Sequence, residues 1–111
     1  MAKQAGTLRK IVALKRQSAE QHLRAVQNDA ERIEAALGVL RENLRALDEV
    51  RAGFDAHRLS EENGHARKLL ADIRIADEAL ALKRADLHAA REALKRVFHS
   101  EERLSQAGPK G

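Results

Sequence analysis

The sequence predicts an all-α fold in which two long helices form an antiparallel coiled-coil hairpin. Three observations predict it: apolar residues recur at every seventh position, this pattern breaks once near mid-chain, and Ala, Leu, Glu, Lys and Arg dominate the composition. With 34% charged and only 2% aromatic residues, the chain lacks the bulky side chains of an ordinary globular core. Its 111 residues are therefore expected to form a single helical domain, 1–111.

The first helix is expected over about residues 8–53, where apolar residues form two rows offset by four positions. The first row holds Val12, Ala19, Val26, Ile33, Leu40, Leu47 and Phe54, and the second holds Leu23, Ala30, Leu37 and Leu44, with Arg16 and Arg51 at its ends. Alternating steps of three and four, sustained over about six heptads with charged residues between them, are typical of a coiled-coil seam.

The start of this helix has a broader apolar pattern, because Leu8, Ile11 and Leu14 lie outside both rows. They either widen the buried face or form an exposed apolar strip for a partner, and the sequence leaves both interpretations open. Thr7 is expected to cap the helix after a frayed stretch over residues 1–6. Gly38 falls on the outer face, where it costs about 1 kcal/mol relative to Ala.

The pattern breaks between Gly53 and Gly64, which predicts the bend of the hairpin. Ser60, followed by two acids, favours a helix start, whereas Asn63 and Gly64 offer a rival turn. A second ladder follows in a different register: Leu59, Ala66, Ile73, Leu80, Leu87 and Leu94, with Leu69, Ala76, Ala90, Val97 and Leu104 between them and Lys83 as the polar exception. The expected ranges are a bend over 54–64, a second helix over about 60–105 and a disordered tail over 106–111.

The two ladders also predict how they pair. In the preferred register large residues face small ones, as good packing requires. This register pairs Leu23 with Ala90, Ala19 with Leu94, Leu37 with Ala76, Leu47 with Ala66, and Ala30 with Lys83. Glu101 then lies near Arg9 and Arg16 and provides a counter-charge to them. A shift by one heptad, which would put the bend at Asn63 and Gly64, is the alternative.

Charge is unevenly distributed along the chain. Residues 1–24 hold six bases and one acid, residues 25–64 hold five bases and nine acids, and residues 65–111 hold ten bases and seven acids. Folding the chain into a hairpin brings its two basic ends together. The hairpin is therefore expected to be basic at its open end and acidic at its bend.

No pattern in the sequence predicts catalysis. Without Cys the chain has neither a disulfide nor a thiolate metal site, and its five His are not spaced as ligands beside a carboxylate. Phosphate-binding loops and nucleophile motifs are also missing. We therefore expect a non-enzymatic protein with no catalytic residue, cofactor or metal. No apolar run approaches the roughly 20 residues of a membrane span or the core of a signal peptide, so the expected location is cytoplasmic.

Two classes of binding function fit these features. The first is an adaptor that docks in a larger protein assembly through its basic end, its tip or both. The second is a basic helical protein that binds nucleic acid. Bases alternate with acids after residue 24, and no Trp or Tyr is present to stack on bases, which favours the adaptor. A general coiled-coil scaffold and a nucleic-acid-binding protein are the alternatives.

Two segments resemble a known family. The opening segment from Leu8 to Arg16 reads LRKIVALKR and is similar to the L-x-x-[LI]-x-x-L-[RK] start of the FliJ/YscO family of type III (flagellar or injectisome) export stalk proteins. The segment from Lys83 to Lys95, KRADLHAAREALK, is similar to the basic end of that family's second helix. The resemblance spans nearly the whole chain in its layout.

The resemblance implies a cytoplasmic component of an export machine, similar to the central stalk of rotary ATPases and placed at the cytoplasmic face of the inner membrane by its partners. The implied partners are the hexameric export ATPase, the export gate and export chaperones. Nucleic acid is not expected as a partner, because of the alternating charges and the missing Trp and Tyr noted above. Contacts with the ATPase ring are assigned to basic residues at the open end: Arg9, Lys10, Arg16, Arg91, Lys95 and Arg96. Contacts with the gate are assigned to the acidic half near Leu44, Leu47, Leu69 and Ile73, residues that the seam also explains.

Overall fold

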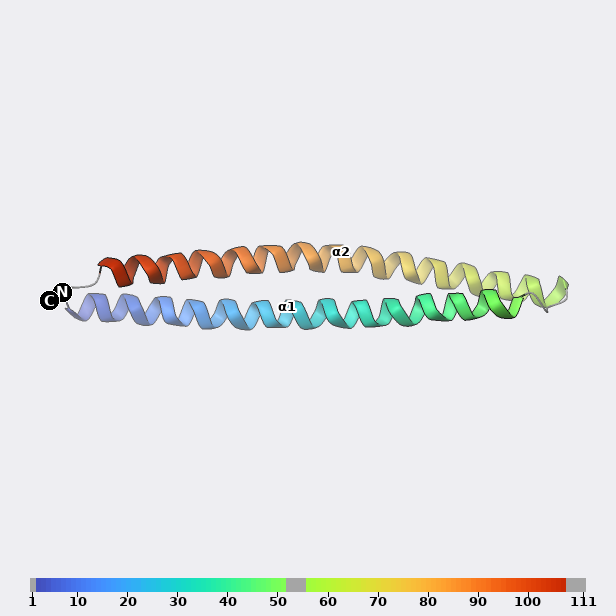
Figure 1. Ribbon diagram of the computed structural model, residues 1–111, viewed down its shortest axis with the longest axis horizontal. Helices are drawn as coiled ribbons and strands as arrows, with labels where there is room; N and C mark the ends of the chain where they lie inside the picture. Colours follow the sequence, from blue (N-terminus) through green and yellow to red (C-terminus); the bar gives the residue numbers. More distant parts are fainter. Residues whose placement is uncertain (1, 52–55, 108–111) are drawn as a thin grey trace. The chain divides into compact units, whose positions relative to one another are not determined.

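The computed structural model describes residues 2–51 and 56–107, and it places all of them in two α-helices (Figure 1). Helix α1 spans Ala2–Arg51 and helix α2 spans Ala56–Ala107. Side chains are described over residues 4–50 and 63–106. The predicted all-α hairpin of two long antiparallel helices is confirmed.

Helix α1 begins earlier than the sequence analysis predicts. It starts at Ala2 rather than near residue 8, so Thr7 lies inside the helix and does not cap it. Ala, Lys and Gln are strong helix formers, and the single Gly6 costs only about 1 kcal/mol, so the helix continues through this stretch. The predicted end near residue 53 lies outside the described residues.

Helix α2 also extends beyond its predicted limits. It begins at Ala56, so Ser60 is not its first residue. The alternative prediction of a turn at Asn63 and Gly64 is wrong, because both residues lie within the helix. Glu and Arg around these positions favour the helix, and one glycine is too weak a signal to end it. The helix ends at Ala107. Of the predicted bend over 54–64, residues 54–55 lie outside the described residues and the others are helical. Of the predicted tail over 106–111, residues 106–107 are helical and 108–111 lie outside the described residues.

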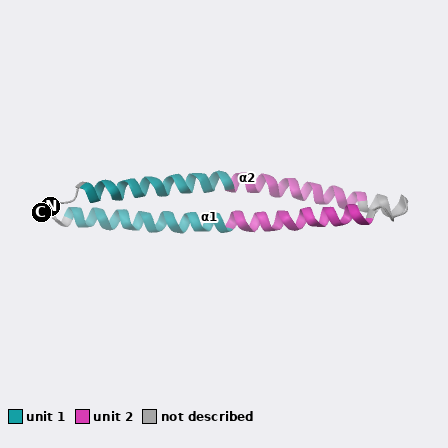
Figure 2. Cartoon of the chain, viewed as in Figure 1, with its two compact units in different colours: residues 1–28, 84–111 teal, residues 29–83 magenta. Residues whose placement is uncertain are grey.

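Contacts divide the chain into two units, each built from a segment of α1 and a segment of α2 (Figure 2). Unit 1 comprises residues 1–28 and 84–111, and unit 2 comprises residues 29–83. The seam side chains that the structure describes are all buried or half-buried in their units, apart from Arg16. The two rows predicted on each helix are therefore the packing surfaces.

The core of unit 2 consists of aliphatic side chains from both helices. Ala30, Leu37 and Leu80 are buried in one cluster, against which Ile33, Ile73 and Ala76 pack. Lys83 Nζ lies 3.4 Å from Asp29 Oδ2, which puts Lys83 beside the turn that carries Ala30. This contact agrees with the preferred register, because the shifted register would place Lys83 opposite Leu37 instead.

Unit 1 is held by a similar seam and by a predicted ion pair. Val26 and Ala90 are buried, and Arg16 Nη1 donates a hydrogen bond of 3.2 Å to Glu101 Oε2. The expected proximity of Glu101 to Arg16 is confirmed. Arg9 borders the same surface hollow as Glu101 and Leu104, again as the preferred register requires.

The structure decides between the two interpretations of the apolar residues at the start of α1. Leu8 is 50% exposed, Ile11 43% and Leu14 65%, so these side chains form an exposed strip and do not widen the buried face. In the seam of unit 1 the half-buried residues of this part of α1 are instead Val12 and Ala19, which belong to the predicted apolar row.

Gly38 lies in α1 on the exposed face predicted for it, and a Cβ placed there meets no atom within 4 Å. Gly38→Ala is therefore expected to raise the free energy of unfolding by about 1 kcal/mol, because alanine restricts the unfolded chain and suits the helix. Urea unfolding followed by circular dichroism measures the change. Ala35→Gly, on the same exposed stretch, is the opposite control and should lower stability by a similar amount. An unchanged midpoint for Gly38→Ala would contradict the placement of Gly38 inside a helix.

Candidate binding surface in unit 1

The six basic residues predicted to contact a partner all belong to unit 1, and all are exposed. Helix α1 contributes Arg9, Lys10 and Arg16, and helix α2 contributes Arg91, Lys95 and Arg96. Unit 1 holds twelve bases and five acids, whereas unit 2 holds nine bases and twelve acids. The positive charge of the chain is therefore concentrated in unit 1.

In the first turns of α1, basic residues occur in the sequence without acidic residues among them. The first acid of the chain is Glu20, and five bases precede it: Lys3, Arg9, Lys10, Lys15 and Arg16. The amino end of a helix is itself positive, because its first N–H groups point outward without partners along the helix. Helix dipole and side chains thus give this segment a positive potential that favours anionic partners.

Two of the six cations take part in ion pairs that leave them accessible. Arg16 contacts Glu101 and also Glu20, whose Oε1 lies 3.8 Å from its Nε. Lys95 Nζ donates a hydrogen bond of 3.2 Å to Glu92 Oε1, and this bond and the charge of Lys95 lower the pKa of Glu92 below its usual value. Because these pairs face water, they are weak, and an acidic group of a partner can compete for the bases.

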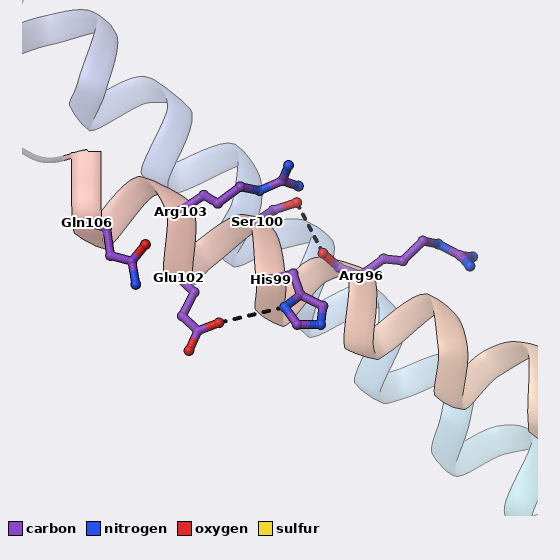
Figure 3. Close-up of a pocket in the computed structure, with 6 residues that line it drawn as sticks. All are labelled: Arg96, His99, Ser100, Glu102, Arg103 and Gln106. Atoms are coloured by element: carbon purple, nitrogen blue, oxygen red, sulfur yellow. Dashed lines mark hydrogen bonds and ion pairs between the residues drawn. The ribbon is translucent and has the colours of Figure 1, made fainter.

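Arg96 borders a shallow hollow on the surface of α2 (Figure 3). The residues around it come from this one helix: Arg96, His99, Ser100, Glu102, Arg103 and Gln106. Ser100 Oγ donates a hydrogen bond of 3.1 Å to the Arg96 carbonyl oxygen, and His99 Nδ1 lies 3.7 Å from Glu102 Oε2. In Figure 3 the Arg96 and Glu102 side chains extend away from each other. A hollow on one helix cannot enclose a small ligand, so a catalytic pocket is not formed here.

The structure brings Lys10, Arg16 and Lys95 to one side of unit 1. One hollow is bordered by Lys10, Leu14 and Arg16 of α1, and another by Lys95, Phe98 and Glu101 of α2. The Arg16–Glu101 ion pair joins them, so the hollows are adjacent. We call this surface, consisting of Lys10, Leu14, Arg16, Lys95 and Phe98, the basic–apolar face. Arg9 borders a hollow that shares Glu101 and Ser105 with the Lys95 hollow, and Arg96 borders one that shares His99 and Glu102 with it.

Phe98 belongs to this surface although the heptad pattern does not predict it there. Its side chain is 46% exposed, and it lies directly after the seam residue Val97, outside the second ladder. A large apolar residue that departs from the heptad rows was the available signal. Next to Lys95 and across the ion pair from Leu14, Phe98 adds an aromatic group to a basic surface.

The four residues predicted near the export gate are seam residues of unit 2. Leu69 is buried, Leu44 and Leu47 are half-buried, and Ile73 packs against the buried cluster. Their side chains are therefore occupied in packing α1 against α2. Among the side chains that the structure describes in unit 2, the large apolar ones that are exposed lie outside the ladders, at Val39, Val50, Leu70, Ile75 and Leu82, and the heptad pattern does not single them out.

Within the part of the chain that the structure describes, no group of three or more His, Cys, Asp or Glu side chains is arranged to hold a metal ion. Neither described helix contains a stretch long and apolar enough to cross a membrane.

Comparisons of the chain with protein-family models, with curated proteins and with solved structures gave no match. The resemblance of its opening and closing segments to export stalk proteins therefore rests on the residues of those segments.

Proposed function

We propose that the chain is a non-enzymatic coiled-coil adaptor of a type III export apparatus, in which unit 1 binds the export ATPase ring. The observation that carries this proposal is the concentration of exposed bases in unit 1. The apolar rows of α1 and α2 in this unit pack against each other. A seam that is used internally leaves the outer surface for partners. Charged side chains on that surface steer encounters and select oppositely charged partners.

The identity of the partner comes from the resemblance of the Leu8–Arg16 and Lys83–Lys95 segments to the FliJ/YscO family. In this proposal Arg9, Lys10, Arg16, Arg91, Lys95 and Arg96 contact acidic groups of the ATPase ring. The exposure of all six residues supports it, because each can reach a partner without unfolding the hairpin.

The proposal also assigns the acidic unit 2 to the export gate. Because Leu44, Leu47, Leu69 and Ile73 pack in the seam, the gate would contact exposed residues around them. Val50 and Leu70 are apolar side chains of this kind, and they are 52% and 53% exposed. The chain would thus reach the cytoplasmic face of the inner membrane through the ATPase and the gate.

Reversing three charges in unit 1 tests the ATPase assignment. The triple variant Arg9→Glu, Lys10→Glu and Lys95→Glu is expected to weaken binding to the export ATPase at least about tenfold, because attraction to acidic groups becomes repulsion. Pull-down and titration with the purified ATPase measure the change. Its matched control reverses three exposed bases of unit 2, Arg67, Lys68 and Arg74, and changes the net charge equally. ATPase binding that survives the unit 1 variant, or falls equally in the control, would contradict the proposal.

A further inference from the structure

We propose that unit 1 also binds directly to the surface of a lipid bilayer that contains anionic phospholipids. The contact is made by Leu8, Ile11 and Leu14 of α1 together with the bases on the same helical turns. This inference does not depend on the export role, which reaches the membrane only through protein partners.

The apolar part of this surface is exposed although it consists of large aliphatic side chains. Leu14 is the most exposed of the three at 65%, and Leu8 and Ile11 precede it at intervals of three residues. Such a strip is unfavourable in water and is favourable at the boundary between lipid headgroups and acyl chains.

The polar part of the surface has the charge that anionic lipids attract. Lys10 and Lys15 are exposed on the turns that carry the strip, and no acid occurs on α1 before Glu20. Lysine stems are long enough to lie along an apolar surface while the ammonium group reaches the headgroups. Basic residues beside an apolar helical face are the composition of helices that lie in a membrane interface.

The geometry of the strip favours a bilayer over a protein groove. Residues three apart on a helix differ by roughly 60° around its axis, so Leu8, Ile11 and Leu14 fan over roughly a third of the circumference. A helix that inserts into a protein groove presents a narrow stripe with anchors at intervals of three, four and seven residues. At seven residues after Leu8 stands Lys15, so this stripe is interrupted. A bilayer surface accommodates the wider fan.

A nucleic acid would match the bases of unit 1 but not the aliphatic strip. Its backbone is contacted by Lys and Arg, and single strands additionally stack on aromatic rings. Three exposed aliphatic side chains have no counterpart in either mode. The coexistence of aliphatic and basic side chains is what identifies lipid as the partner.

The chain contains no Trp or Tyr, so a single introduced tryptophan reports on its own position. In Leu14→Trp, emission is expected to shift to shorter wavelength when vesicles of phosphatidylcholine with about 30% phosphatidylglycerol are added, but not with phosphatidylcholine alone. Val39→Trp is the matched control, because Val39 is 60% exposed on the same helix but in unit 2. Absence of a shift in Leu14→Trp, or an equal shift in both variants, would overturn the proposal.

A second set of variants keeps every charge and removes only apolar surface. Leu8→Gln, Ile11→Gln and Leu14→Gln together are expected to weaken vesicle binding at least about tenfold, whereas Val39→Gln, Ile75→Gln and Leu82→Gln leave it unchanged. Circular dichroism verifies that both sets remain helical. Vesicle binding that is equally strong in the two sets would overturn the proposal. The proposal would also be overturned if the protein bound duplex DNA more tightly than vesicles and the three substitutions at Leu8, Ile11 and Leu14 left that DNA binding unchanged. These assays contain no ATPase, so their result is separate from that of the charge reversals.

Discussion

Leu37→Ala is expected to lower the free energy of unfolding by about 2–3 kcal/mol, which is a large part of the stability of a small helical protein. Leu37 is only 3% exposed, and it belongs to the buried cluster with Ala30 and Leu80. Removing its branched end takes away these contacts and leaves a gap between α1 and α2. The expected cost lies near the lower end for buried leucines, because unit 2 is only two helices thick and water can fill the gap. Urea unfolding followed by circular dichroism measures the cost.

Val39→Ala provides the control, because it shortens a side chain two residues further along the same helix. Val39 is largely exposed, so its truncation should change the free energy of unfolding by less than about 0.5 kcal/mol. Equal costs at positions 37 and 39 would contradict the arrangement of the seam and show that α1 packs through a different face.

Exchanging a large residue for a small one across unit 1 is expected to separate the two possible registers. Ala90 is 3% exposed, and the preferred register places it opposite Leu23. Ala90→Leu alone should cost about 1–3 kcal/mol through overpacking, and Leu23→Ala alone about 2 kcal/mol through lost packing. If the two residues face each other, the double variant restores the volume between the helices. It should then be more stable than the sum of the single effects predicts, by at least about 1 kcal/mol.

The outcome of this double-mutant cycle depends on register alone. The register shifted by one heptad places Leu23 opposite Val97 rather than Ala90, so the two substitutions would not compensate. Costs that add within about 0.5 kcal/mol would therefore contradict the preferred register. Thermal or urea unfolding of the four proteins completes the cycle.

Most of the candidate surface could be predicted, because the sequence shows where the charged residues are concentrated along the chain. The six bases assigned to a partner lie in unit 1 and are exposed, as a basic open end requires. Their division among different hollows could not be predicted, since it depends on which side of each helix faces the other. For the same reason Leu14 and Phe98, 84 positions apart in number, were not expected on one face with Lys10 and Lys95.

The helix boundaries were predicted least well. Thr7 and Ser60 are good caps, and Asn63 with Gly64 is a common turn pair, yet all four lie inside helices. Each local signal contributes about 1 kcal/mol, and helix propagation across favourable neighbours outweighs it. The gate assignment near Leu44, Leu47, Leu69 and Ile73 competed with a second prediction for the same residues, because the heptad pattern also placed them in the seam. The structure shows them packed in that seam.

The seven-residue repeat determined the class of fold, because a repeated apolar row on each of two helices is most stable when the rows cover each other. It also determined which residues, such as Leu37 and Ala90, are buried. Tertiary packing decided what becomes of Leu8, Ile11 and Leu14. A helix of this composition can present a wide or a narrow apolar face to its partner, and only the contact with α2 selects one of them. In this chain α2 covers the narrow seam, and the three aliphatic side chains remain exposed among the bases of unit 1.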